Sequence, residues 1–225
     1  MLKLTPILLA VLYGLIMYRF SVWRTTRELD EKSAELADPT LRALAARMAT
    51  ALDLPRIKVH IYDIDAVNGL AAPDGRIFIT RGFYQKYRAG EVSAEELASV
   101  IAHELGHVAL GHSRRRIIDF SGQNAMRVAL GMMLSRFLPG IGVYIANALT
   151  TLLAARLSRQ DEFEADEYAT ALLTKAGIGS AAQKSMFRKL QKLTGQGTPM
   201  AAWLMSHPKT EDRIAAIEAN EEKWA

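Results

Sequence analysis

The sequence predicts an α+β fold in which most of the chain is helical, with a small β-sheet and an apolar helix at the N-terminus. Three observations support this prediction. Residues 93–108 have the periodicity of a buried helix, residues 57–62 and 76–80 alternate or cluster apolar side chains as strands do, and residues 4–18 carry no charge. Start signals predict further helices at residues 39–52, 180–193 and 210–222.

Size and composition indicate one sizeable globular domain with additional segments. The chain has 225 residues, half of them hydrophobic, and a mild net charge of +4. Its short basic cluster, Arg114–Arg116, is typical of a solvated turn, so no nucleic-acid partner is expected. The lack of cysteine excludes disulfides and thiolate ligands but selects no compartment.

The N-terminal segment, residues 1–24, predicts a membrane anchor that precedes a domain over residues 25–225. Extending the uncharged run 4–18 to Phe20, with Arg19 reaching toward the interface, gives the roughly 17 residues that a spanning helix needs. A signal peptide is the alternative, but no small-x-small cleavage site follows.

Charges on either side of this segment favour one orientation. Arg19, Arg24 and Arg27 follow it, against Lys3 and the α-amino group before it. The positive-inside rule then favours a cytoplasmic domain.

The most informative stretch is the pentapeptide His103-Glu104-Leu105-Gly106-His107. Histidines four residues apart share one face of a helix and can bind one divalent metal ion, while Glu104 can take a proton from a metal-bound water. Ser93 and Glu96 form a capping box that begins this helix. Its apolar stripe contains Leu97, Val100, Ile101, Leu105 and Val108. A solvated helix with two chance histidines is the alternative.

A zinc peptidase needs a third protein ligand and an open position for water. His112 is one candidate, but the metzincin pattern requires a glycine and a histidine where this chain has Leu110 and Ser113. That pattern therefore fails, and His112 is expected to cap or line the end of the motif helix.

A carboxylate on a second helix is the other candidate. Glu162 and Asp166 lie four residues apart, so that Glu162 could bind the metal while Asp166 accepts the outer N–H of a liganding histidine. Glu164 and Glu167 are expected to face solvent or form salt bridges. An ordinary charged helix surface is the alternative for the whole run.

With these motifs the chain resembles the HtpX-like family of zinc peptidases, which includes the CAAX prenyl proteases and the BepA-type peptidases. The resemblance covers roughly residues 40–220 in the family's order. It rests on the pentapeptide at 103–107, the S-R-x-x-E-x-E-A-D run at 158–166, Ser206-His207-Pro208 followed by Arg213, and Asn68–Ala71 leading into residues 75–82.

The resemblance implies a zincin-type metallopeptidase domain with one Zn²⁺ per chain. His103, His107 and Glu162 are then the metal ligands. Glu104 is the general base, and Asp166 supports a histidine from outside the metal shell.

Two further residues have roles that the resemblance implies less firmly. His207 corresponds to a family histidine that stabilises the oxyanion or occupies the metal's open position, although a histidine before proline is also a common helix-entry residue. Arg213 would orient His207 or a carboxylate, or would be a surface charge.

The resemblance also implies a polypeptide substrate in extended conformation. Residues 76–80 are expected to form the edge strand over the zinc, to which a peptide adds through main-chain hydrogen bonds. Proteolytic quality control of misfolded proteins at a bacterial-type inner membrane is the implied role. The cytoplasmic or periplasmic side and the oligomeric state remain open.

Residues 120–157 separate the two ligand-bearing segments and are largely apolar. Gly140–Leu153 is too short to span a bilayer comfortably. A helical hairpin that covers the cleft as a lid, or that lies against the bilayer, is expected here.

Two other functions remain open. A non-catalytic, chaperone-like module could bind extended peptides on the same edge strand, although such a module has no need of Glu104. A helical protein that only stores metal or anchors a partner would bind zinc without cleaving any substrate.

Overall fold

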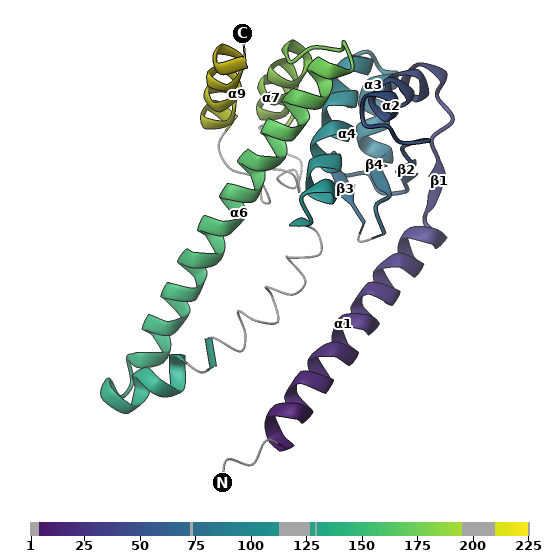
Figure 1. Cartoon of the computed structure of the whole chain (residues 1–225). Helices are drawn as coiled ribbons and strands as arrows, with labels where there is room; N and C mark the ends of the chain where they lie inside the picture. Colours follow the sequence, from purple (N-terminus) through teal and green to yellow (C-terminus); the bar gives the residue numbers. More distant parts are fainter. Residues whose placement is uncertain (1–4, 73, 113–126, 129, 195–209, 225) are drawn as a thin grey trace. The chain divides into compact units, whose positions relative to one another are not determined.

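The computed structural model describes residues 5–72, 74–112, 127–128, 130–194 and 210–224. The chain divides into two compact units: residues 1–31 with 113–157, and residues 32–112 with 158–225. Figure 1 follows the chain through both.

The first unit is helical over most of its described residues, with a turn at 138–141. Helix α1 (Thr5–Glu31) contains most of the predicted anchor segment. Helical residues 130–137 precede the beginning of helix α6 (Gly142–Lys175), whose later residues belong to the second unit. Among the described residues, no helix combines the length and the apolar character needed to cross a bilayer.

The second unit contains a mixed sheet of four strands, β1 (Ser33–Glu35), β2 (Val59–Tyr62), β3 (Gly69–Ala71) and β4 (Ile77–Thr80). Their spatial order is β1-β2-β4-β3, with β2 and β4 parallel and the two outer pairs antiparallel. The predicted strands at 57–62 and 76–80 are confirmed as β2 and β4.

The prediction that residues 76–80 form the edge strand is wrong. All four residues of β4 are buried, and the strand lies between β2 and β3. Residues 69–71 fold back beside it, and the amide of Thr80 donates to the carbonyl of Asn68 over 3.0 Å. Within the described sheet, β3 is therefore the edge strand beside β4.

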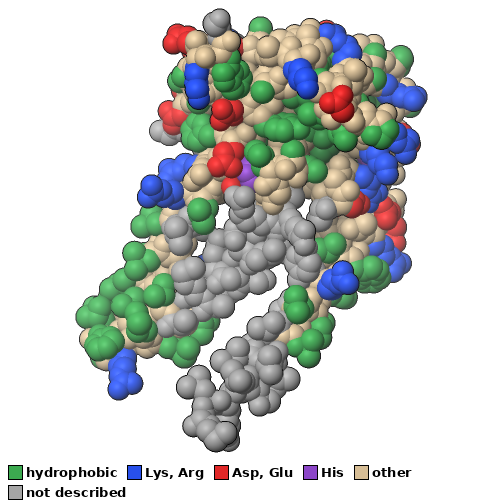
Figure 2. All heavy atoms as spheres, viewed as in Figure 1, with side chains coloured by type: hydrophobic (Ala, Val, Ile, Leu, Met, Phe, Trp, Pro, Cys, Tyr) green, Lys and Arg blue, Asp and Glu red, His purple; other side chains and the backbone are tan. Residues whose placement is uncertain are grey.

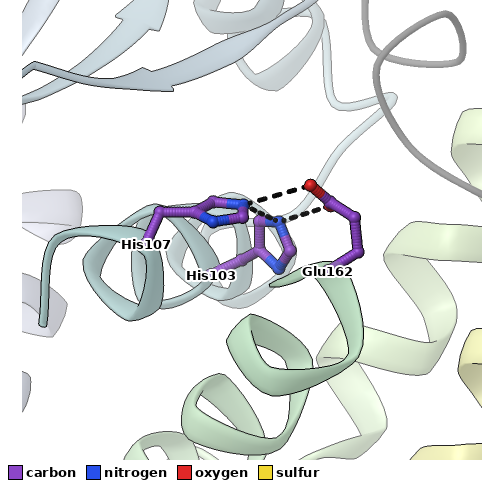
Figure 3. A group of neighbouring side chains, drawn as sticks. All are labelled: His103, His107 and Glu162. Atoms are coloured by element: carbon purple, nitrogen blue, oxygen red, sulfur yellow. Dashed lines mark hydrogen bonds and ion pairs between the residues drawn. The ribbon is translucent and has the colours of Figure 1, made fainter. Parts of the chain in front are cut away.

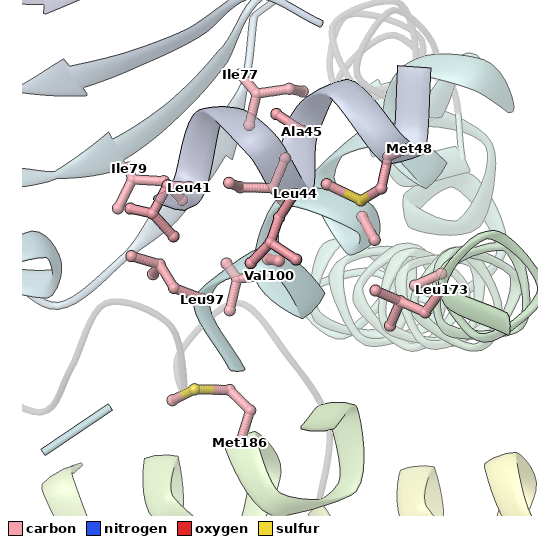
Figure 4. Packing of buried hydrophobic residues seen from close by; sticks show 14 of the residues in the cluster. Leu41, Leu44, Ala45, Met48, Ile77, Ile79, Leu97, Val100, Leu173 and Met186 are labelled. Carbon is pink, nitrogen blue, oxygen red and sulfur yellow. The ribbon is translucent and has the colours of Figure 1, made fainter. Parts of the chain in front are cut away.

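Helix α4 (Ala94–Ala109) lies at the centre of the second unit. It packs against helix α2 (Pro39–Ala51), helix α7 (Ala181–Thr194) and strands β3 and β4. Every residue from Glu96 to His107 is buried, so the apolar stripe packs into the core while the polar side chains of this stretch are also enclosed. Figure 4 shows the surrounding core, which includes Leu41, Leu44, Met48, Ile77, Ile79, Leu97, Val100, Leu173 and Met186.

The helix starts expected from the sequence are present. Asp38 caps α2 by accepting from the amides of Thr40 and Leu41, and Pro39 is its first residue. The capping box of Ser93 and Glu96 is complete at α4. The helices predicted at 39–52, 180–193 and 210–222 are confirmed as α2, α7 and α9 (Thr210–Trp224). Helix α3 (Arg81–Arg88) directly follows β4.

Glu96 also joins α4 to α7. Its carboxylate accepts hydrogen bonds from the amide of Ser93 at 2.7 Å, the hydroxyl of Ser185 at 2.6 Å and the ammonium of Lys189 at 2.7 Å. Burial would raise the pKa of Glu96, but these three donors together hold it below its usual value.

We expect Glu96→Gln to lower the free energy of unfolding at pH 7 by about 1–2 kcal/mol, because a charge-assisted contact with a half-exposed lysine is lost. A depressed carboxyl pKa stabilises the fold above the unfolded-state value of about 4.3, and this stabilisation disappears as the pH falls through the folded-state pKa. The difference between variant and wild type should therefore shrink in acid.

Thermal unfolding at pH 7 and in acid measures this difference. Glu95→Gln is the matched control, since Glu95 is exposed in the same first turn. An equal loss for both variants, or a pH-independent loss at Glu96, would contradict the assignment.

Candidate metal centre and active site

The two histidines of the pentapeptide lie on one face of α4. His103 and His107 are buried, and their Nε2 atoms are 3.1 Å apart. Their rings are nearly perpendicular, at 89°. The i, i+4 spacing on a rigid buried helix is what brings the two nitrogens to a single point.

Helix α6 brings Glu162 to the same point. Its Oε2 atom lies 3.3 Å from Nε2 of His103, and its Oε1 atom lies 3.4 Å from Nε2 of His107. Figure 3 shows the two imidazoles and the carboxylate pointing toward one another. The three residues are buried and form a group whose ligand atoms could hold one metal ion.

The spacing of these atoms suits tetrahedral zinc. Ligand atoms bound at about 2.0–2.1 Å to a tetrahedral ion lie roughly 3.3 Å from one another. The two Nε2 atoms, 3.1 Å apart, match that edge length, and each has one oxygen of the Glu162 carboxylate at a similar distance, Oε2 at 3.3 Å from His103 and Oε1 at 3.4 Å from His107. Two imidazoles and one carboxylate also leave the fourth corner for water, as in catalytic zinc sites.

The charges of the buried side chains around the site also favour a bound cation. The carboxylates of Glu104, Glu162 and Asp166 are buried with one guanidinium, that of Arg213, which leaves a formal excess of two negative charges among these four. Buried charge of one sign is costly, and a divalent cation would neutralise this excess.

A close contact between backbones allows Glu162 to reach the histidines. A Cβ atom added to Gly106 would lie 2.9 Å from the carbonyl oxygen and 3.0 Å from the Cα atom of Ala165. Any larger residue at position 106 would hold α4 away from α6. The glycine within the pentapeptide therefore sets the distance between the helices that carry the three ligands.

Asp166 and Arg213 lie on the side of His103 that faces away from the metal position. Oδ1 of Asp166 is 2.9 Å from Nδ1 of His103, which leaves Nε2 directed at the metal position. Arg213, on α9, donates to both oxygens of Asp166 at 2.6 Å and lies over the ring of Phe187. It is buried against a carboxylate and is not a surface charge.

The ionisation of these groups follows from their contacts. Burial raises the pKa of Asp166, but the guanidinium of Arg213 outweighs that effect and holds the pKa below its usual value. Burial lowers the pKa of His103, yet hydrogen bonds to Asp166 and Glu162 raise it to about 9. A proton and a cation therefore compete for this imidazole.

Glu104 lies against the edge strand. A Cβ atom at Gly69, the first residue of β3, would be 3.3 Å from both Cγ and Oε1 of Glu104 and 2.8 Å from Cγ1 of Val100. The missing side chain at Gly69 thus lets the β3 backbone pass directly over α4 beside the carboxylate of Glu104. The sequence offered this glycine only as a single residue after Asn68, with no sign of its neighbours.

Glu164 and Glu167 have surroundings of the kind expected, His112 has an additional contact, and His207 cannot be placed. His112 does not merely line the helix end, since its Nδ1 atom lies 3.0 Å from Nδ1 of His107. Glu164 is half-buried and contacts His112, whereas Glu167 is exposed. His207 lies outside the described residues.

The comparisons with known proteins agree on one family. The model of Peptidase family M48 matches residues 35–221. Metalloprotease LoiP of Escherichia coli is 29% identical over 184 residues, which cover 79% of this chain and 68% of LoiP. Protease HtpX of Pseudomonas aeruginosa is 26% identical over 209 residues, covering 75% of this chain and 67% of that protein.

A more distant relative has a longer chain. The human mitochondrial metalloendopeptidase OMA1 is 24% identical over 168 residues, 71% of this chain but only 31% of OMA1. The family match extends over most of the chain, including all the candidate ligands, and it confirms the resemblance noted in the sequence. This chain belongs to peptidase family M48.

Proposed function

We propose that this chain is a membrane-associated zinc endopeptidase in which His103, His107 and Glu162 hold one Zn²⁺ and Glu104 is the general base. Its membership of family M48 makes it a metallopeptidase. The observation that carries the assignment of ligands is the convergence of three buried side chains: the two Nε2 atoms lie 3.1 Å apart, and each lies 3.3 or 3.4 Å from an oxygen of the Glu162 carboxylate.

The chain's own residues account for the proton transfers. Zinc, when bound, polarises the scissile carbonyl and lowers the pKa of a water molecule toward neutrality. Glu104 takes the proton from the attacking water and returns it to the leaving amine. Its position on α4, one residue after His103, keeps its carboxylate buried beside the metal position.

Other residues hold this arrangement in place. Asp166 fixes the tautomer of His103, and Arg213 fixes Asp166. For His207 we retain the role that the family resemblance implies, stabilisation of the oxyanion.

The edge strand indicates how the substrate binds. In the described sheet β3 pairs with β4 alone, and a Cβ atom on its first residue, Gly69, would lie 3.3 Å from Oε1 of Glu104. A peptide that adds to β3 through main-chain hydrogen bonds would place a scissile bond close to that carboxylate. Recognition of backbone rather than side chains selects extended or misfolded polypeptides, which fits a role in proteolytic quality control.

The first unit is suited to contact with lipid. Its most exposed large apolar side chains include Met132, Phe137, Tyr144 and Leu152, each about 70% exposed (69%, 72%, 73% and 68%). Residues 120–160 contain arginines but no aspartate or glutamate. Figure 2 shows hydrophobic side chains gathered at the N-terminal end of α6. An apolar surface with basic residues is typical of elements that lie in a membrane interface.

We expect Glu104→Gln to keep zinc but to lower the rate of casein hydrolysis at least about 100-fold, because the general base is removed while the ligands stay. Metal content and casein cleavage of the purified chain measure the two effects. Glu167→Gln, an exposed glutamate on α6, should match the wild type in both.

A Glu104→Gln variant that cleaves casein at the wild-type rate would remove this mechanism. If the variant fully replaces the wild type in a deletion strain while inactive on casein, a chaperone-like function is favoured instead.

We expect Gly106→Ala to weaken zinc binding by about 10- to 100-fold, as when the support of metal ligands is lost. Alanine favours a helix by roughly 1 kcal/mol over glycine, but the new Cβ would meet the backbone of Ala165, which cannot rotate away. Competition with a chromogenic chelator measures the affinity.

Gly131→Ala is the control for this substitution. Its added Cβ would meet only Val143, at an ordinary 3.9 Å. Equal zinc affinities for Gly106→Ala and the wild type would show that the helix contact does not set the ligand geometry.

We expect a fluorophore at position 137 to enter the acyl region of anionic vesicles. The chain has no cysteine, so Phe137→Cys gives a single labelling site, and Leu54→Cys gives a control in the second unit. Quenching by nitroxide lipids should be strong at 137 and weak at 54. Equal exposure of both labels to a water-soluble quencher would contradict the membrane contact.

A further inference from the structure

His112 contacts a proposed metal ligand through one ring nitrogen and acidic residues of α6 through the other. Its Nδ1 atom is 3.0 Å from Nδ1 of His107, on the side of that ring opposite the metal position. Its Nε2 atom is 3.1 Å from Oε2 of Glu164 and 3.6 Å from Oδ1 of Asp161. His112 is fully buried.

The backbone explains how a residue five positions beyond His107 returns to it. Helix α4 ends at Ala109, and Gly111 has a φ of +72°, a conformation that other residues rarely adopt. The chain therefore turns just after the helix, and His112 packs against its last turn.

The positions of the protons in the contacts from His107 to Glu164 follow if His107 binds a metal ion. If His107 binds a cation through Nε2, its neutral ring carries its proton on Nδ1. That N–H must donate to Nδ1 of His112, which is then the acceptor. The proton of His112 is left on Nε2, where it donates to Glu164.

We propose that His112 is a positioning residue that holds His107 in the tautomer and orientation needed for metal binding, with Glu164 fixing His112 in turn. This rests on the proposed function, since it assumes that His107 is a ligand. His107 then has the same kind of support that Asp166 gives to His103, delivered through a second imidazole.

The carboxylate of Glu164, the last group in this series of contacts, has a second hydrogen-bond partner. Oε1 of Glu164 accepts from the side-chain amide of Gln160 at 2.9 Å, while Oε2 faces His112. The contact between the buried His112 and the half-buried Glu164 therefore links the segment just after α4 to α6, and the exposed Gln160 restrains the outer oxygen.

The same geometry argues against a second metal ion at His112, Asp161 and Glu164, although their ligand atoms also form a compact group. A cation on Nε2 of His112 would require a proton on its Nδ1. Two N–H groups would then face each other over 3.0 Å with no acceptor between them whenever His107 also binds metal. Occupation of the first site thus disfavours the second.

The test compares two substitutions of similar size. His112→Leu removes the acceptor for the buried N–H of His107, whereas His112→Asn offers an amide oxygen near the position of Nδ1. We expect zinc affinity, measured by chelator competition, to fall about 10- to 100-fold in His112→Leu and to be largely restored in His112→Asn. The visible spectrum of the Co²⁺-substituted chain should change in the same order.

Glu164→Gln examines the far end of the contact without disturbing the core. It should weaken zinc binding in the same direction but less than His112→Leu, while Glu167→Gln, on the exposed side of α6, should leave it unchanged.

A direct measurement needs no substitution. The chain has five histidines, so the ¹⁵N resonances of their rings can be assigned one by one. In the zinc-loaded protein, His112 should show an unprotonated Nδ1 and a protonated Nε2.

The proposal is overturned if His112→Leu binds zinc as tightly as the wild type, if Leu and Asn weaken binding equally, or if Nδ1 of His112 carries the proton. A wild-type chain that binds no zinc would instead overturn the proposed function, which separates the two failures.

Discussion

The contact between Gly106 and the backbone of Ala165 is the constraint on which the rest of the site depends. Two ligands lie on α4 and the third on α6, so the distance between these helices decides whether one ion can be shared. With no side chain at position 106, the backbones meet at van der Waals distance. The surrounding core makes α4 rigid enough for that distance to be maintained.

Both histidines are held from behind, but by different means. His103 is oriented by a carboxylate that a buried guanidinium neutralises, and His107 contacts a second imidazole. Each arrangement ends on an acidic residue of the same short segment of α6, Asp166 in one case and Glu164 in the other. The segment that supplies the third ligand therefore also organises the first two.

Local patterns in the sequence were sufficient to predict several helices and the pair of histidines at the site. The capping box, the i, i+4 histidines and the start of α2 depend on residues a few positions apart, and all are present in the structure. The need for a third ligand and the i, i+4 spacing made Glu162 a candidate, and the family resemblance selected it over an ordinary charged helix surface. The roles of the individual site residues remain predictions.

What the sequence could not provide depends on distant neighbours. Strand periodicity does not say which strand lies beside which, and the edge position that the resemblance implies for residues 76–80 belongs to β3. Gly69 has no distinguishing pattern until Val100 and Glu104 are seen beneath it. The contact between His112 and His107 forms because α4 stops at Ala109 and the chain turns there, which no motif spacing reveals.

The position of Arg213 has a consequence for biosynthesis. It follows His103 by 110 residues and Asp166 by 47. A nascent chain thus exposes its candidate ligands well before the guanidinium that stabilises them leaves the ribosome. Until α9 docks, Asp166 lacks the guanidinium that offsets the cost of burying its carboxylate, so we expect the candidate site to be completed only after nearly the whole chain has been synthesised.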